Sequence, residues 1–165
     1  MKFEKVSEEE FKKRVIELFG GDELDEVMEK FKNMKLPSRS TASSAGYDFH
    51  LPFSISIRPG ETFIIPTGIK VKLDPDKVLM IAPRSSIGIK KHLRLANTQA
   101  YIDADYYNNP DNEGHILLAF KSENKNTLGF IAGDKIAQGI IIQYYTTEDD
   151  NCTEVRNGGI GSTGN

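Results

Sequence analysis

The stretch Phe53-Ser54-Ile55-Ser56-Ile57-Arg58 alternates apolar and polar side chains without a break, and Pro59-Gly60 follows it. Strict alternation places the apolar side chains on one face of an extended strand. Pro-Gly is a strong turn signal. The stretch therefore predicts a half-buried strand that ends in a turn.

Further short apolar runs separated by turn signals extend to Tyr145. Between Gly68 and Leu73 the chain alternates again, with Ile69, Val71 and Leu73 on one face. No helical pattern interrupts these runs, which favours an all-β sandwich or barrel over residues 36–145. The other predicted strands cover residues 63–65, 78–81, 115–120 and 139–145.

Residues 1–35 have a different texture and predict two amphipathic helices. Ser7-Glu8-Glu9-Glu10 is a capping-box pattern, in which Ser7 and Glu10 satisfy each other's backbone donors. Gly20-Gly21 ends the first helix, and Asp22 is the expected cap of the second. We expect this N-terminal helical extension to pack on the main domain rather than to dock a partner.

Size and charge limit the classes of function. The chain has 165 residues and a net charge of -3, so no global field attracts nucleic acid or an anionic membrane. No apolar run is long enough to span a membrane, and Met1-Lys2-Phe3-Glu4-Lys5 does not open a signal peptide. Cys152 stands alone, which suits a reducing compartment. These features predict a cytoplasmic protein.

The tail, residues 146–165, is polar and reads as a mobile C-terminal arm. It ends in Gly158-Gly159-Ile160-Gly161-Ser162-Thr163-Gly164. Closely spaced glycines let backbone amides approach an anion, and the two hydroxyls stand beside them. The tail therefore predicts a phosphate-binding motif.

Five short polar motifs occur in a fixed order and together supply a carboxylate base, a phosphate clamp and a glycine-rich flap. They suit hydrolysis of a nucleoside triphosphate. The tail motif is the last, and the other four are Ala45-Gly46-Tyr47-Asp48, Pro83-Arg84-Ser85-Ser86, the segment from Ala100 to Tyr106, and Gly133-Asp134-Lys135-Ile136-Ala137-Gln138.

With these motifs the chain resembles the homotrimeric dUTP diphosphatases (dUTPases) over roughly residues 36–164. The resemblance implies a jelly-roll β-barrel subunit, a homotrimer with three active sites at subunit interfaces, and dUTP as substrate. It implies cleavage to dUMP and pyrophosphate with Mg2+, which limits uracil in DNA and supplies dUMP for dTMP synthesis.

The resemblance also assigns residues. Asp103 matches the base that positions the attacking water, although Asp105 would lie on the same face of an extended segment and is a rival on geometry alone. Asp48 matches a supporting carboxylate. The phosphate-binding positions are Arg84, Ser85, Ser86 and Gln138.

The nucleoside positions follow in the same way. Asn97 and the backbone of Ala100, Tyr101 and Ile102 match the hairpin that binds uracil, with Ala100 where glycine is usual. Tyr106 matches the tyrosine that packs on the deoxyribose and leaves no room for a 2′-hydroxyl.

Arg156, Gly159, Ser162 and Thr163 match the arm that closes over the γ-phosphate. Besides Ala100, the chain departs from the common pattern at three places. Arg156 lies one residue nearer the glycine pair than usual. Ile160 replaces a phenylalanine that stacks on uracil, and residues 107–112 form an insertion after Tyr106.

Two alternatives are weighed. A dCTP deaminase of the same fold shares the Arg-Ser-Ser and Ile-Asp elements, but it carries an essential glutamate where this chain has Leu117-Leu118-Ala119. A non-catalytic dUTP-binding regulator would not need Asp103. No cluster of His, Cys and carboxylates has ligand spacing, so Mg2+ is expected to be held mainly by triphosphate oxygens and water.

Overall fold

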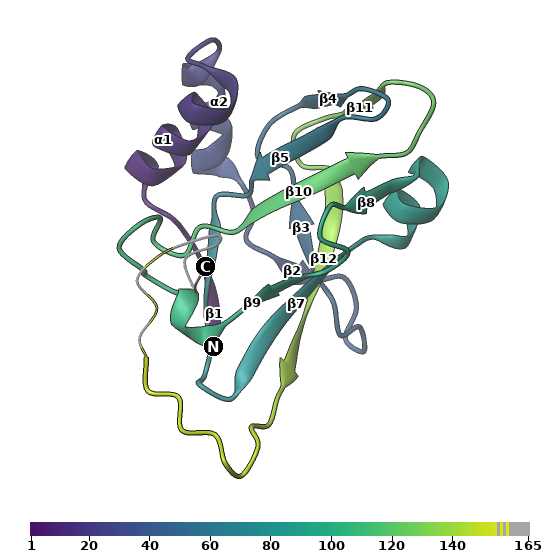
Figure 1. Cartoon of the computed structure of the whole chain (residues 1–165). Helices are drawn as coiled ribbons and strands as arrows, with labels where there is room; N and C mark the ends of the chain where they lie inside the picture. Colours follow the sequence, from purple (N-terminus) through teal and green to yellow (C-terminus); the bar gives the residue numbers. More distant parts are fainter. Residues whose placement is uncertain (155, 157, 159–165) are drawn as a thin grey trace.

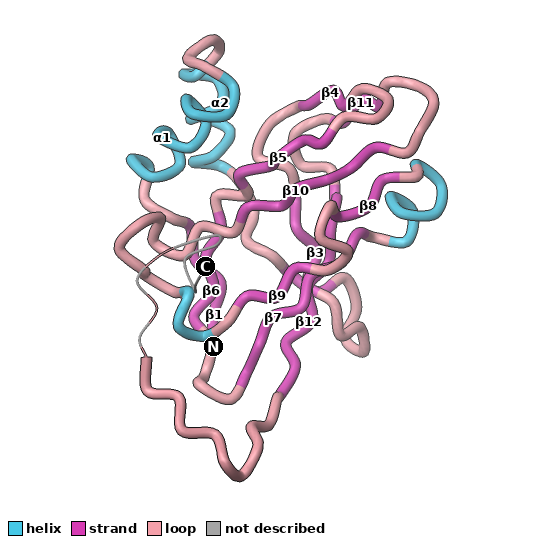
Figure 2. The backbone as a smooth tube through the Cα atoms, viewed as in Figure 1, coloured by secondary structure: helices cyan, strands magenta, loops and turns pink. Residues whose placement is uncertain are grey.

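The computed structural model describes residues 1–154, Arg156 and Gly158. Figures 1 and 2 show short strands packed into a barrel-like body, with two helices at one corner. The strands are β1 (Lys2–Lys5), β2 (Ser38–Arg39), β3 (Tyr47–His50), β4 (Ile55–Ile57), β5 (Thr62–Pro66), β6 (Ile69–Lys72), β7 (Lys77–Pro83), β8 (Leu93–Leu95), β9 (Ala100–Ile102), β10 (Leu117–Ser122), β11 (Leu128–Phe130) and β12 (Lys135–Gln143).

The largest sheet has five strands in the order β2-β3-β12-β7-β9. A second sheet has the order β5-β10-β8, and the pairs β1-β6 and β11-β4 form two-stranded sheets. All of these ladders are antiparallel. In the largest sheet β12 is central and β9 lies at an edge, which places the third predicted motif at the rim.

Alternation in the sequence produces the core. Ile69 and Val71 of β6 are each 2% exposed, while Lys72, the last residue of β6, is exposed, as the alternating pattern predicts. From the facing sheets Leu79, Ile81 and Phe120 are fully buried. The all-β class with a short helical extension is confirmed.

The extension contains helices α1 (Glu8–Phe19) and α2 (Leu24–Asn33). They pack against each other through Phe11 and Phe31, whose rings stack with centroids 4.1 Å apart. Phe19 reaches the barrel and packs on Phe53 and Phe63. The helices thus bury their apolar stripes on each other and on the barrel.

Two capping predictions are wrong in part. The Ser7 hydroxyl accepts a hydrogen bond from the Glu10 amide at 3.0 Å, as predicted. The Glu10 carboxylate, however, contacts His115, and the Ser7 amide donates to Glu113. Glu23, not Asp22, occupies the N-cap position of α2. In α1 tertiary partners replace half of the capping box, whereas the Glu23 side chain makes no capping hydrogen bond in α2.

Strand bounds also differ from the predictions. β12 begins at Lys135, four residues before the predicted start at Gly139, and ends before Tyr144. Only Ile55–Ile57 of the opening stretch pairs in a ladder, with β11. The sequence pattern did not predict β1, because Lys2-Phe3-Glu4-Lys5 is charged and pairs only with β6. Among the residues described, no helix has the length and apolar character to cross a membrane.

Candidate active site

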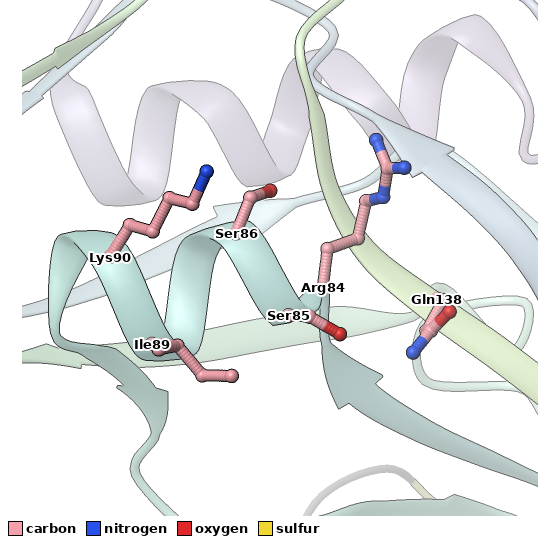
Figure 3. Close-up of a pocket in the computed structure, with 6 residues that line it drawn as sticks. All are labelled: Arg84, Ser85, Ser86, Ile89, Lys90 and Gln138. Atoms are coloured by element: carbon pink, nitrogen blue, oxygen red, sulfur yellow. The ribbon is translucent and has the colours of Figure 1, made fainter.

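Residues from the second and fourth motifs converge on one cavity. Arg84, Ser85, Ser86 and Gln138 line a cavity of about 400 Å³ together with Ile89 and Lys90. Arg84 follows the end of β7, and Ser86 begins a short π-helix, Ser86–Lys90. Figure 3 shows the Ser85 hydroxyl and the Gln138 amide pointing toward one another beside Arg84. The polar groups of the lining residues are therefore one guanidinium, one ammonium, two hydroxyls and one amide, which suit phosphate oxygens.

Strand register gathers these side chains. Gln138 on β12 pairs with Ala82 on β7 and with Asp48 on β3. Directly paired residues point to the same face, so Gln138 and Asp48 stand side by side. A bulge between Lys135 and Ala137 makes Lys135 pair with His50, which places Lys135 on that face too. In a regular strand, Lys135 and Gln138 would point to opposite faces.

Asp48 is the centre of a polar network and is 5% exposed. Its carboxylate lies 3.3 Å from Arg84 Nε and 2.7 Å from Lys135 Nζ, and it accepts a hydrogen bond of 2.6 Å from Ser40. Burial raises the pKa of Asp48, but the hydrogen bonds from Lys135 and Ser40 and the charge of Arg84 outweigh it and hold the pKa below its ordinary value. Asp48 therefore stays ionised and fixes Arg84.

Gly46 leaves the space that the Gln138 side chain occupies. A Cβ atom added at Gly46 would lie 3.0 Å from Oε1 of Gln138, closer than ordinary contacts allow. The absent side chain thus lets the Gln138 amide lie against the backbone of the first motif. We call Asp48, Arg84, Ser85, Ser86 and Gln138 the phosphate-side cluster.

The third motif lies elsewhere. Asp103 and Asp105 follow β9 and line a second cavity of about 510 Å³. Arg156 from the tail donates to Asp103 Oδ2 at 2.7 Å and to Asp105 Oδ1 at 2.9 Å. Its guanidinium lies 5.7 Å from the centroid of the Tyr106 ring. We call Asp103, Asp105, Tyr106 and Arg156 the base-side cluster.

Within this cluster the exposure of the side chains differs. Both aspartate side chains are 53% exposed, and that of Arg156 is 15% exposed. Tyr106 is 7% exposed, and its hydroxyl donates to the His115 carbonyl at 3.0 Å. Burial raises the pKa of Tyr106 above its ordinary value. The carboxylates are accessible to a ligand, whereas the tyrosine is fixed below them.

The two clusters lie far apart on the chain's own sheet. Ile102 on β9 pairs with Leu79 on β7, so the next residue, Asp103, lies beside Val78 near the start of β7. Arg84 follows the other end of β7. Six residues of strand separate these levels, roughly 20 Å at about 3.3 Å per residue. Arg84 also reaches Asp48 on β3, in the direction away from β9. One chain does not bring Asp103 to its own phosphate-side cluster.

The predicted uracil-binding segment is not a simple hairpin. Asn97 lies in the exposed turn between β8 and β9, but β8 pairs with β10 and β9 pairs with β7. The turn therefore connects two different sheets, and the role of this segment in binding uracil stays a prediction. Ala100 is 8% exposed and Tyr101 is 59% exposed. Within the described sheets β9 is an edge strand, so one side of its backbone is open to a ligand.

The tail was expected to bind the γ-phosphate. The structure places Arg156 on the aspartates of its own chain. The predicted residues Gly159, Ile160, Ser162 and Thr163 lie outside the described residues. Cys152 is exposed and unpaired with any other cysteine. The roles of the tail residues therefore stay predictions.

Sequence reasoning missed two members of the Asp48 network. Lys135 stands inside the fourth motif, and Ser40 belongs to the polar run Ser38-Arg39-Ser40-Thr41 just before the first. Lys135 Nζ also donates to Ser40 at 2.8 Å. A basic residue within a phosphate-binding motif was an available signal. The bulge that turns Lys135 toward Asp48 has no sequence signal of its own.

Across the described part of the chain, no group of three or more His, Cys, Asp or Glu side chains is placed to hold a metal ion. The carboxylates divide instead between Asp48, which binds cations of the protein, and the pair Asp103 and Asp105. This donor set fits a cation that arrives with a triphosphate better than a metal held by protein ligands alone.

Comparison with known proteins gives a consistent result. The family model described as dUTPase matches residues 32–164. A deoxyuridine 5'-triphosphate nucleotidohydrolase of Lactococcus lactis is 41% identical over 143 residues, covering 84% of this chain and 95% of the relative.

Solved structures agree. The dUTPase from Streptococcus mutans has a TM-score of 0.65 at 39% identity, with 68% of this chain and 88% of that chain covered. A mutant dUTPase from phage phi11 of S. aureus, described for its coordination of a structural Mg(II) ion, has a TM-score of 0.62. At 23% identity, over 74% of this chain and 92% of that chain, it shows the fold alone. These likenesses confirm the predicted jelly-roll β-barrel class.

Proposed function

This chain belongs to the dUTPase family, and we propose that it cleaves dUTP into dUMP and pyrophosphate at a site shared between copies of the chain. The observation that carries the proposal is the pairing of a preassembled phosphate-side cluster with an exposed carboxylate pair roughly 20 Å along the sheet. Groups suited to phosphate binding and groups suited to water activation both occur, but on different parts of the chain.

The phosphate-side cluster binds the triphosphate. The Arg84 guanidinium, held by Asp48, donates to phosphate oxygens, and Ser85, Ser86 and Gln138 add neutral donors. Because Asp48 and Lys135 are already paired, the cluster binds phosphate without rearranging its buried charges.

Asp103 activates the water. Its carboxylate orients a water molecule toward the α-phosphorus and accepts its proton as the new P–O bond forms. The bond between the α-phosphorus and the oxygen bridging to the β-phosphorus breaks, and pyrophosphate leaves. Asp105 shares Arg156 with Asp103 and is the rival base.

The separation of the clusters supports a symmetric oligomer in which Asp103 of one copy meets the phosphate-side cluster of another. A homotrimer, as the family resemblance implies, closes this arrangement and yields three equivalent sites. The edge backbone of β9 then binds uracil, and Tyr106 packs on the deoxyribose, where a ribose 2′-hydroxyl would collide.

Mg2+ is part of the substrate in this proposal. The cation neutralises triphosphate oxygens and is held mainly by them and by water, in keeping with the donor set of the described residues. The reaction limits uracil in DNA and supplies dUMP for dTMP synthesis. A cytoplasmic location stays a prediction of the sequence.

The rival activities lack support in the site. In a dCTP deaminase a glutamate follows the aspartate motif, but Leu117, Leu118 and Ala119 occupy that stretch and lie within β10. A regulator that only binds dUTP has no use for the exposed carboxylate pair.

The test is pyrophosphate release from dUTP, dCTP, dTTP and UTP with Mg2+, alongside ammonia release from dCTP. Fast release from dUTP alone is expected. Ammonia from dCTP would assign the chain to the deaminases. Tight dUTP binding without turnover would assign it to the regulators.

A further inference from the structure

Two features have no role in the proposed reaction. One is the N-terminal extension. The other is the loop of residues 107–114 between Tyr106 and β10, which contains the predicted insertion of residues 107–112. The structure brings them together. Glu113 accepts hydrogen bonds from the Ser7 amide and from Lys70 Nζ, each at 3.1 Å. The Tyr107 hydroxyl donates to Glu4 on β1. The loop is thus attached to the extension at Glu4 of β1 and at Ser7, the N-cap of α1.

The loop encloses the hydroxyl and the backbone of Tyr106. Asn112 is 3% exposed, and its amide donates to the Tyr106 hydroxyl at 2.8 Å. Asn109 is 5% exposed, and its amide donates to the Tyr106 carbonyl at 2.8 Å. Gly114 has φ +82, and a Cβ there would lie 2.6 Å from the Tyr106 carbonyl oxygen. Only glycine permits this approach of the loop to Tyr106.

The Tyr106 hydroxyl therefore both donates and accepts a hydrogen bond. It donates to the backbone carbonyl of His115 at 3.0 Å and accepts from Asn112. Because a buried hydroxyl that both donates and accepts a hydrogen bond is fixed in one orientation, the Tyr106 ring is fixed as well. The position of the ring depends on where His115 is held.

His115 is held by α1. Its side chain is fully buried, and the Gly68 amide donates to Nε2 at 2.9 Å. Nε2 is then the acceptor nitrogen, so Nδ1 carries the proton and donates to Glu10 Oε1 at 3.1 Å. Glu10 is 6% exposed, and Arg14 Nη2 lies 3.7 Å from the same oxygen. Burial lowers the pKa of His115 although Glu10 opposes this, so the ring stays neutral.

These contacts form one chain from the extension to Tyr106: the Glu10 carboxylate, the His115 ring, the His115 carbonyl and the Tyr106 hydroxyl. We propose that Glu10 and His115 are positioning residues that hold the Tyr106 ring and thereby set discrimination between deoxyribose and ribose. The inference rests on the proposed function, in which Tyr106 packs on the sugar. It gives the extension and the inserted loop a shared role in substrate selection.

The test compares kcat/KM for dUTP with kcat/KM for UTP. Glu10→Ala leaves the buried Nδ1–H of His115 without its acceptor, and the ratio is expected to fall about tenfold. Glu10→Gln keeps an acceptor oxygen and should restore most of the ratio. Glu9→Ala, on the exposed face of the same helix, is the matched control and should leave it unchanged. An equal loss for both nucleotides in Glu10→Ala, with the ratio intact, would overturn the proposal.

A double-mutant cycle keeps the proposal testable if Glu10→Ala is poorly folded. Tyr106→Phe removes the hydroxyl that the chain of contacts holds, and it should lower the ratio by a similar factor. Glu10→Asp withdraws the carboxylate from Nδ1 of His115 by one methylene and should lower the ratio by itself. If Glu10 acts through the Tyr106 hydroxyl, Glu10→Asp and Tyr106→Phe combined should equal Tyr106→Phe alone. Independent, multiplying effects would contradict the proposed connection.

Nitrogen-15 NMR of the imidazole separates this inference from the proposed activity. The wild type should show His115 as the neutral Nδ1–H tautomer, and its Nδ1 resonance should shift in Glu10→Gln but not in Glu9→Ala. A wild type that shows this signature without hydrolysing dUTP would remove the proposed function and leave the contact intact. The opposite tautomer in an active enzyme would remove the inference alone.

Discussion

The phosphate-side cluster stands on the middle strands of the five-stranded sheet, whereas the base-side cluster follows its edge strand β9. The first is buried around Asp48, which has three partners from separate parts of the chain. The second exposes half of each aspartate side chain, and its cation comes from the tail.

This contrast follows from what each cluster has to do. A phosphate clamp works by preorganisation, so its donors are fixed by ladder register and buried charge. In the proposed shared site, the base must meet a water molecule and a substrate bound to another copy, and the exposed carboxylates of Asp103 and Asp105 allow this. Under that proposal, the fold completes one half of the site within a chain and leaves the other half to assembly.

The largest expected effect is at the base. Asp103→Asn removes the proton acceptor but keeps the shape of the side chain, and kcat should fall by about 10²–10⁴-fold while dUTP still binds. Single-turnover pyrophosphate release and binding of a non-hydrolysable dUTP analogue measure the two separately. Asp105→Asn is the matched variant, and a larger loss there would transfer the role of base to Asp105.

The comparison is sharpened by mixing two impaired variants at a dUTP concentration where each alone has little activity. Asp103→Asn supplies an intact clamp and Arg84→Ala supplies an intact base, so an equal mixture assembled from unfolded chains should recover about a quarter of the wild-type rate. A quarter follows because each site draws its two halves from different copies at random. Failure of well-folded mixed oligomers to regain activity would show that both halves act within one chain.

Removal of the phosphate-binding guanidinium should lower activity less than removal of the base does. Arg84→Ala removes the guanidinium and leaves Asp48 with one fewer cation, and kcat/KM for dUTP should fall by about 10–100-fold. Steady-state kinetics measure it. Arg94→Ala is the control, because Arg94 pairs with Glu123 on the exposed surface and belongs to neither cluster.

Asp48, which holds Arg84, should also contribute to the free energy of unfolding through its ion pairs. Its folded pKa lies below the ordinary 3.8, so its contribution is present above pH 3.8 and is lost as the pH falls through the folded pKa. Asp48→Asn should cost about 2–3 kcal/mol of unfolding free energy at pH 7 and less below pH 3.8. Denaturant unfolding across pH measures this. Asp76→Asn, at an exposed ion pair, should show no comparable loss, and a pH-independent cost at Asp48 would contradict the account.

The smallest expected effect is at Gly46. Gly46→Ala adds a Cβ 3.0 Å from Gln138 Oε1, and a shift of the flexible amide should lower kcat/KM by less than about tenfold. Gly129→Ala meets no atom within 4 Å and is the matched control. Equal behaviour of the two variants would show that the position of Gln138 is not critical.

The sequence by itself determined the all-β class, the two helices and the order of the motifs. Alternation in Ile69-Lys70-Val71 and helical spacing in α1 are local patterns, and local patterns record which face of an element is buried. The motif residues could be named because short segments carry their own chemistry, as Arg84-Ser85-Ser86 does.

Only the tertiary structure decided how those residues combine. Register and a bulge bring Lys135 to Asp48, and the turn after β8 connects two different sheets. Glu10, expected to cap its own helix, binds His115 at a sequence distance of 105 residues. Contacts of this kind depend on how sheets and loops pack, and no local pattern encodes them. The same packing separates Asp103 from Arg84 along β7, and this separation is the reason for proposing a site shared between copies of the chain.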